Sequence, residues 1–382
     1  MNASLTLGRI FGIRISINWS WLVVFVLIVW SLASEVFPAQ NDGLSDGVYA
    51  AMAVAAALLF FASLLLHELG HAIQARREGM EIDGITLWLF GGVAAFRGMF
   101  PSAGAEFRIA IAGPLVTLVL GALFVGLAIV TPMADAVDGV LAWLGITNLL
   151  LLVFNLLPAL PLDGGRVLRS ALWGARGDFG WATRVAAGIG RAFGYAFIAG
   201  GIALLIFADA FSGAWIAFMG WFLLGAASAE TRHLAVREAL GGLRVRDLMV
   251  REPATVPPTL SLGRFMDDVV WNRRYTTYPV VEDGRAVGLI PFRCVAEVPR
   301  SEWDDRTVRD CMLAREDVPV LEQDDELVDA LGELSERGVG RGLVVDGERL
   351  AGLLSVTDVL RALEIRRRAR GKPSPVPLPP TP

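Results

Sequence analysis

The first 230 residues contain a series of apolar runs that are long enough to cross a membrane. A transmembrane helix needs roughly 20 mostly apolar residues, because each helical residue rises about 1.5 Å and the hydrocarbon layer is about 30 Å thick. The sequence therefore predicts a polytopic α-helical membrane domain of about six spans. The predicted spans are Ile15–Ser34, Val48–Leu66, Ile109–Val130, Val140–Leu157, Val185–Phe207 and Ala214–Ala229.

The composition fits a membrane protein that also carries a soluble part. Hydrophobic residues make up 54% of the 382 residues and charged residues only 19%, which is too apolar for an ordinary soluble protein. Residues 243–370 are richer in charge and have the composition of a soluble domain. The net charge of -5 gives no reason to expect a nucleic-acid partner.

The distribution of arginine orients the predicted spans. Segments 35–47 and 131–139 contain acidic residues but no Arg or Lys, whereas arginines lie at the opposite ends of the spans. The positive-inside rule then places both termini in the cytoplasm, and an even number of spans agrees with this. We therefore expect a multi-pass protein of the cell (plasma) membrane, in contact with lipid.

The second apolar run ends in H-E-L-G-H, residues 67–71. Residues i and i+4 of a helix share one face, so His67 and His71 can bind one metal ion, and neutral imidazole suits zinc. Glu68 is placed to take a proton from a zinc-bound water. The alternative is a chance pair of core histidines. However, the chain has only three histidines, and a carboxylate at membrane depth is unfavourable unless it has a function or a partner.

A catalytic zinc ion needs a third protein ligand and keeps one position for water. Asp163 is the best candidate, within N-L-L-P-A-L-P-L-D-G-G-R at residues 155–166. Prolines and glycines are expected to break the helix around it, and broken backbone at membrane depth is tolerated where it lines a site. Spans two and four run in the same direction, so their ends reach the same side of the membrane. An ordinary Pro-Asp-Gly turn is the alternative.

These two motifs, in this order, resemble those of the site-2 protease family of intramembrane zinc metalloproteases. The resemblance covers the membrane part of the chain. It implies that His67, His71 and Asp163 bind one Zn²⁺ ion and that Glu68 is the catalytic base. It also implies that Asn155 lies in the active site, in contact with the substrate backbone or the developing oxyanion. A polar residue at a helix end is the alternative for Asn155.

Residues 81–96 match the family in a further segment, predicted as short strands broken by glycines. In the family this segment forms a membrane-associated β element whose edge holds the substrate as an added strand, which exposes a carbonyl that a helix would hide. The resemblance thus suggests Gly91, Gly92 and Val93 as substrate-binding residues, with an amphipathic turn region as the alternative. At Thr117 this chain departs from the family, which often has an asparagine there.

Residues 243–366 contain an internal repeat. The sequence V-R-D-L-M at 245–249 recurs as V-R-D-C-M at 308–312, and the apolar segment at 279–281 recurs at 343–345. A period of this length indicates a duplicated α/β domain rather than a solenoid. The repeat resembles a tandem pair of CBS domains, a module that commonly binds adenine nucleotides.

The nucleotide-contacting positions of that module are matched only in the second copy. Ser355, Thr357 and Asp358 occupy positions that contact phosphate and ribose in the family, and the first copy lacks their equivalents. The resemblance therefore implies at most one site for AMP or ATP. It leaves open whether the pair binds nucleotide or serves as a homodimerisation module.

Taken together, the sequence predicts a metalloprotease domain followed by an α/β module. The predicted boundaries are 1–240 for the transmembrane domain, 241–300 and 301–366 for the two CBS domains, and 367–382 for a Pro-rich disordered tail.

The expected function is hydrolysis of peptide bonds in or near transmembrane segments of regulatory membrane proteins. The family suggests single-span regulators such as anti-sigma factors or membrane-bound transcription factors. The alternative is a CBS-gated transporter or receptor with structural zinc. A structural zinc site normally has four protein ligands and no need of a carboxylate such as Glu68 beside them.

Overall fold

The computed structural model describes residues 4–88, 91–96, 98–130, 134–336 and 338–369. The chain divides into two compact units, Met1–Arg232 and His233–Pro382. The predicted tail at 367–382 lies largely outside the described residues.

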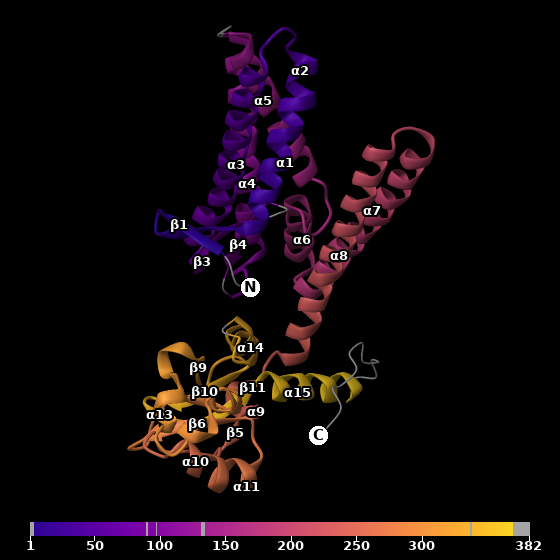
Figure 1. Ribbon diagram of the computed structural model, residues 1–382. Helices are drawn as coiled ribbons and strands as arrows, with labels where there is room; N and C mark the ends of the chain where they lie inside the picture. The colour runs from indigo at the N-terminus through magenta and orange to yellow at the C-terminus, as the bar shows by residue number, and fades with distance from the viewer. Residues whose placement is uncertain (1–3, 89–90, 97, 131–133, 337, 370–382) are drawn as a thin grey trace. The chain divides into compact units, whose positions relative to one another are not determined.

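Six helical segments in the described part of the first unit are long and apolar enough to cross a membrane (Figure 1). The prediction of a polytopic helical membrane domain is therefore confirmed. The segments are α1 with its continuation through η1 and α2 (Trp19–Ser31, Leu32–Val36 and Phe37–Gln40), α3 (Asp46–Arg77), α4 (Ala103–Val130), α5 (Asp135–Asn155), α7 (Phe179–Phe207) and α8 (Ala210–Leu240), of which α8 ends within the second unit. A shorter helix, α6 (Asp163–Arg176), lies between α5 and α7 in the chain.

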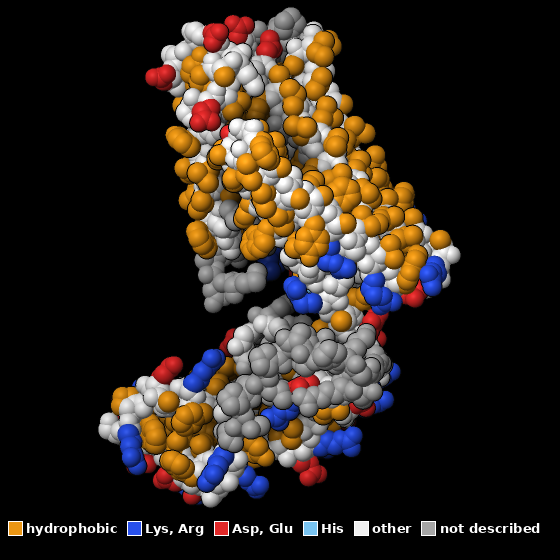
Figure 2. Space-filling model, turned by 90° about the vertical axis from the view of Figure 1, so that its right-hand side faces the viewer, with side chains coloured by type: hydrophobic (Ala, Val, Ile, Leu, Met, Phe, Trp, Pro, Cys, Tyr) orange, Lys and Arg blue, Asp and Glu red, His pale blue; other side chains and the backbone are white. Residues whose placement is uncertain are grey.

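The outer surface of these helices is apolar. Large side chains such as Val119, Ile129 and Leu150 are well exposed, which is unfavourable in water and natural in hydrocarbon. Figure 2 shows hydrophobic side chains covering the flanks of the helices. Acidic side chains without basic ones lie at one end of the unit, and basic side chains gather at the other end beside a few acidic ones. The cytoplasmic location of the termini stays a prediction.

The first span begins later than the sequence predicted. Residues Ile13–Asn18 form a strand, and α1 starts only at Trp19, where the Asn18 side chain accepts a hydrogen bond from the amide of Ser20 at 3.0 Å. The predicted start at Ile15 was wrong because a short strand rich in isoleucine cannot be told from the beginning of an apolar helix by hydrophobicity alone.

A four-stranded sheet packs beside α3. Its order is β1 (Ser4–Ile10), β2 (Ile13–Asn18), β3 (Ile82–Trp88) and β4 (Gly91–Phe96); β2 and β3 are parallel and the outer pairs antiparallel. Buried Ile15 and Ile85 pack against Leu69 and Ala72 of α3. This packing fixes the sheet to the helix that carries the H-E-L-G-H sequence, and β4 forms one edge of the described sheet.

The second unit is the predicted α/β module. Its sheet has the order β6 (Thr277–Glu282), β7 (Arg285–Pro291), β11 (Arg349–Ser355), β10 (Arg341–Asp346) and β9 (Val320–Glu322). In addition, β5 (Val250–Arg251) pairs with β11 and β8 (Leu313–Ala314) pairs with β7, so each copy of the repeat adds a short strand to the other. The helices are α9 (Val245–Leu248), α10 (Leu262–Arg264), α11 (Trp271–Arg273), α12 (Phe292–Ala296), α13 (Val308–Cys311), α14 (Leu327–Glu336) and α15 (Val356–Ala369).

The repeated V-R-D sequence has a structural cause. Both α9 and α13 begin with a capping box in which the aspartate accepts a hydrogen bond from the backbone amide of the N-cap residue: Asp247 from Arg244 at 2.8 Å and Asp310 from Thr307 at 2.7 Å. The repeated aspartate thus ends an extended segment and starts a helix in both copies.

Candidate metal centre

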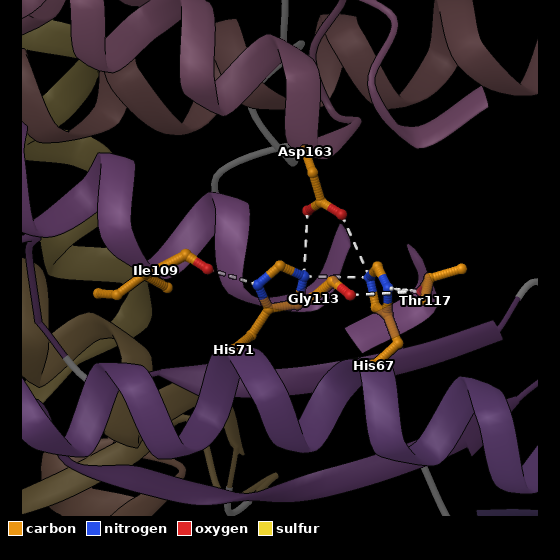
Figure 3. Close-up of polar contacts among 6 residues, drawn as sticks. All are labelled: His67, His71, Ile109, Gly113, Thr117 and Asp163. Atoms are coloured by element: carbon orange, nitrogen blue, oxygen red, sulfur yellow. Dashed lines mark hydrogen bonds and ion pairs between the residues drawn. The ribbon is translucent and has the colours of Figure 1, made fainter. Parts of the chain in front are cut away.

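Three buried side chains from distant parts of the chain meet in the first unit (Figure 3). The Nε2 atom of His67 lies 3.2 Å from Oδ2 of Asp163, and Nε2 of His71 lies 3.3 Å from Oδ1 of the same carboxylate. The two histidines lie one turn apart on α3, while Asp163 comes from α6. The structure therefore brings together the three residues that the sequence predicted as metal ligands.

Hydrogen bonds at the Nδ1 atoms fix the orientation and the tautomer of the two imidazoles. Nδ1 of His71 lies 2.7 Å from the carbonyl oxygen of Ile109, and Nδ1 of His67 lies 2.8 Å from Oγ1 of Thr117. A carbonyl oxygen only accepts, so Nδ1 of His71 carries the proton. The Thr117 hydroxyl can donate to the carbonyl of Gly113 at 3.3 Å and accept from His67. Both Nε2 lone pairs then face the centre, as metal-binding histidines require.

The cluster fits a divalent cation. The two Nε2 atoms lie 3.1 Å apart, so two lone pairs and a carboxylate converge on one small volume. Without a positive charge between them this arrangement is repulsive. Two imidazole nitrogens and one carboxylate, with a fourth position open, form a donor set that zinc takes in catalytic sites.

Helix α4 passes close to the imidazoles because residue 113 is glycine. A Cβ atom at this position would lie 2.7 Å from Nε2 of His67 and even closer to Nε2 of His71. Any side chain here would occupy the space that a metal ion needs. The close approach of α4 to the imidazoles is the physical reason for a glycine at this position.

Asp163 is the first residue of α6. The predicted break in the helix is found before it, at residues 156–162 with both prolines, but the prediction was wrong for the glycines that follow it. Gly164 and Gly165 lie inside the first turn of the helix. A Cβ atom on either one would overlap the backbone of the preceding loop, at Leu156 and Ala159 respectively. The glycines thus let the helix start pack directly on the loop, and they do not break the helix.

A cavity of about 490 Å³ opens beside the three ligands. Glu68, Asn155, Gly91 and Gly92 line it, so these predicted site residues lie around one space. Arg166 also lines it, although the sequence assigned it no role. The remaining lining is mostly apolar: Leu64, Trp88, Leu151, Phe154, Pro161, Leu162, Met219, Phe222 and Leu223.

The backbone of β4 runs against the side chain of Glu68. A Cβ atom added to Gly92 would lie 3.0 Å from Cδ and 3.2 Å from Oε1 of Glu68. The absence of a side chain at residue 92 therefore leaves the carboxylate open to the cavity beside the strand. Val93 lies in β4 opposite Thr86, but its side chain is outside the described residues.

A buried ion cluster holds α6 in place. Arg169 of α6 donates through Nε to Glu106 of α4 at 2.7 Å, and its Nη1 lies 3.5 Å from Glu230 of α8. Its guanidinium also stacks over Phe179, 4.9 Å from the ring centroid. The helix that supplies Asp163 is thereby tied to α4, α7 and α8.

The second unit contains a cavity of about 870 Å³ that includes the predicted nucleotide contacts Ser355, Thr357 and Asp358. The Ser355 hydroxyl donates to Asp358 at 2.5 Å. Four arginines from both copies of the repeat line the same cavity: Arg273, Arg274, Arg341 and Arg361.

Family models match most of both units. A model described as peptidase family M50 matches residues 55–136 and 132–201, and one described as the CBS domain matches residues 245–299 and 308–365.

Full-length relatives bear metalloprotease names. A protein of Mycobacterium tuberculosis named as a zinc metalloprotease, Rip3, is 38% identical over 381 residues, which cover 98% of this chain and 96% of the relative. A zinc metalloprotease of Methanocaldococcus jannaschii is 33% identical over 368 residues, covering 96% of this chain and 97% of the relative. Among solved structures, a site-2 protease from M. jannaschii matches with 29% identity and a TM-score of 0.43, covering 60% of this chain and 96% of that one.

Proposed function

Because the chain belongs to peptidase family M50 and is a metalloprotease, we propose that it is a zinc-dependent intramembrane endopeptidase. Its proposed substrates are regulatory proteins that cross the membrane once, such as anti-sigma factors or membrane-bound transcription factors. The scissile peptide bond would lie within or beside the membrane-spanning segment. The residues that carry the reaction line the cavity in the multi-pass membrane unit.

The metal ligands in this proposal are His67, His71 and Asp163, which hold one zinc ion per chain. Zinc, when bound, supplies a water molecule of lowered pKa and polarises the scissile carbonyl. Thr117 and the Ile109 carbonyl keep both imidazoles in the tautomer that binds metal.

Glu68 and Asn155 are the proposed catalytic residues. Glu68 takes the proton of the attacking water at its carboxylate and returns it to the leaving amine. Asn155, at the end of α5, donates its side-chain amide to the substrate backbone or the oxyanion. Both line the cavity that holds the metal ligands.

We further propose that the substrate binds as an extended strand along β4 at Gly91, Gly92 and Val93. A helical segment engages its carbonyls in its own hydrogen bonds, so it must unwind before a peptide bond can be attacked. The edge of a sheet offers those bonds to an added strand. The contact between Gly92 and Glu68 would bring such a strand next to the catalytic base.

The observation that carries the proposal is the cluster of three converging donors beside a carboxylate in a cavity. The alternative of a transporter or receptor with structural zinc fits less well. Among the described residues the cluster has three ligands, not the four of a structural site, and it opens on a cavity that includes Glu68.

The substitution Glu68→Gln tests the proposal. It keeps the shape of the side chain and removes its basicity, so we expect the variant to retain zinc and to lose cleavage of a single-span substrate in liposomes by at least about 10²-fold. Zinc content is measured by atomic emission and cleavage by mass spectrometry. The exposed Glu35 provides the control, and Glu35→Gln should cleave like the wild type.

Cleavage by Glu68→Gln at the wild-type rate would remove Glu68 from the reaction. Loss of zinc from that variant would mean that the carboxylate holds the metal and does not act as a base.

A second proposal concerns the CBS pair at 241–300 and 301–366. We propose that its cavity binds one adenine nucleotide, AMP or ATP, at Ser355, Thr357 and Asp358, and that the nucleotide regulates the peptidase. The four lining arginines support an anionic ligand. Homodimerisation through this pair remains the alternative role.

For the membrane topology we propose cytoplasmic termini in the plasma membrane. The arginines at one end of the spans and the acidic residues at the other support this orientation.

A further inference from the structure

The first half of helix α6 carries two arginines, Arg166 and Arg169, three residues apart and with opposite surroundings. Arg169 is 4% exposed and has Glu106, Glu230 and Phe179 as partners. Arg166 is half-buried, and its Nε atom is buried with no hydrogen-bond acceptor among the residues that the structure describes. The fold thus satisfies one guanidinium and leaves the other in need of an acceptor.

Arg166 lies at the wall of the reaction cavity. It follows Asp163 by three residues on the same helix, so both side chains project from one face of α6. Glu68, Asn155 and Asp163 line the same cavity. Arg166 is therefore the cationic side chain in a cavity whose other lining is mostly apolar.

An incompletely partnered guanidinium in such a place is costly. It carries five N–H donors and no acceptor, and burial without partners is unfavourable for a charged group. Of the nearby carboxylates, Asp163 faces the two imidazoles, and Oε1 of Glu106 accepts from Arg169. Glu68 lines the same cavity, but its carboxylate does not accept a hydrogen bond from the buried Nε atom of Arg166. The described residues thus supply no acceptor for this Nε atom, whereas a molecule that enters the cavity can supply one.

A peptide that unwinds in the cavity brings the required acceptors. Each residue that leaves a helix frees one carbonyl oxygen, and in an apolar environment an unpaired carbonyl costs several kcal/mol. Pairing with β4 satisfies only one edge of an extended segment. The carbonyls on its other edge need donors from another element, and α6 offers them at Arg166.

We propose that Arg166 binds backbone carbonyl oxygens of the unwound substrate segment and is a substrate-binding residue of the peptidase. This inference rests on the proposed function. It adds a second set of hydrogen-bond donors to the substrate site. In β4 the backbone forms the hydrogen bonds, whereas at Arg166 a side chain donates them. The acceptors are backbone carbonyls, which every peptide sequence has. The site would thus select substrates by how easily the segment unwinds and not by a particular side chain.

The test measures binding apart from cleavage. The probe is a fluorescent single-span peptide of Leu and Ala with a central Gly-Pro pair, in phosphatidylcholine–phosphatidylglycerol liposomes. In the full chain carrying Glu68→Gln, Arg166→Gln should weaken binding of this peptide roughly tenfold to hundredfold, which is the usual effect of losing hydrogen bonds to a charged donor. Arg166→Lys should recover part of the affinity, and zinc content should not change.

Arg176→Gln is the matched control. Arg176 lies near the exposed end of the same helix, 4.4 Å from the ring centroid of Trp181, and does not line the cavity. This variant should bind the peptide like the parent protein. Equal affinity for the peptide in Arg166→Gln and Arg176→Gln would overturn the inference. Loss of zinc or of thermal stability in Arg166→Gln alone would overturn it as well, because it would assign Arg166 a structural role.

Two further results separate this inference from the proposed function. If the wild type binds the peptide through Arg166 but never cleaves it, the proposed function fails and the inference stands. If Arg166→Gln weakens binding only of a peptide with a central Asp, the acceptor is a carboxylate, and the assignment to backbone carbonyls is wrong.

Discussion

The close approach of α4 to the imidazoles of His67 and His71 restricts residue 113 to glycine. Gly113 lies where any Cβ atom would contact Nε2 of both His67 and His71. The same helix contains Gly126, whose added Cβ would meet nothing within 4 Å. Of these two glycines on α4, Gly113 therefore leaves space for the metal centre, whereas a side chain at Gly126 would meet no neighbour.

This contrast gives a prediction at the residue scale. Gly113→Ala should reduce zinc retention after dialysis by at least about tenfold, because outer contacts and space around ligands control metal affinity. Gly126→Ala on the same helix should keep the wild-type zinc content, measured by atomic emission. Full zinc occupancy in Gly113→Ala would mean that α4 can move aside, and that the glycine is not required by the centre.

At the scale of elements, the position of α6 depends on the buried cluster around Arg169. Glu106 is fully buried; its Oε1 atom accepts from Arg169, and its Oε2 atom has no hydrogen-bond partner among the described residues. Removing the guanidinium would leave a buried carboxylate without a counter-charge. The ion pair between Glu78 and Arg108 has the same distance of 2.7 Å, but the Arg108 side chain is more than half exposed, so water can replace its partner.

We therefore predict that Arg169→Gln lowers the free energy of unfolding by about 3–5 kcal/mol, the usual cost of breaking a buried pair. Thermal unfolding in detergent measures this as a lower midpoint. Arg108→Gln, which breaks the exposed pair, should shift the midpoint much less. Adding Glu106→Gln to Arg169→Gln should restore part of the loss. Similar midpoints for Arg169→Gln and Arg108→Gln would contradict the role of the cluster.

At the scale of the whole molecule, the chain joins a membrane unit to an α/β unit through the residues of one helix, α8. The second unit has its own cores, one around Leu240, Leu327 and Leu354 and one around Phe265 and Tyr278. Its cavity is lined by both copies of the repeat. A nucleotide bound there would therefore contact both copies at once.

The matching prediction concerns stoichiometry. The full chain should bind one ATP or AMP, and Asp358→Asn should weaken that binding at least about tenfold, since the ribose loses a charged acceptor. The substituted asparagine can still accept the hydrogen bond from the Ser355 amide at the start of α15. Asp310→Asn is the control, because it makes the same change in the capping box of α13. Isothermal titration should find wild-type affinity in Asp310→Asn. Absence of any nucleotide binding would favour the dimerisation role.

Much of the fold could be predicted from the sequence because its signals are local. The spans follow from apolar length, and H-E-L-G-H follows from the spacing of one helical turn. The start of α1 and the helical setting of Asp163 could not be predicted in this way. In both cases a tertiary contact decided the outcome: β2 pairs with β3, and Gly164 packs on the preceding loop. Hydrophobicity along the sequence does not reveal such contacts.

The sequence by itself determined that the chain crosses a membrane, that two histidines share a helix face, and that a repeat of CBS type follows. Helix geometry fixes the first two, since rise and periodicity are the same in every helix, and the repeat is visible as recurring sequence. Only the tertiary structure decided which of the two arginines in the first half of α6 is paired and which lines the cavity. Arg166 and Arg169 are equivalent in a sequence, and packing against α4 and α8 distinguishes them.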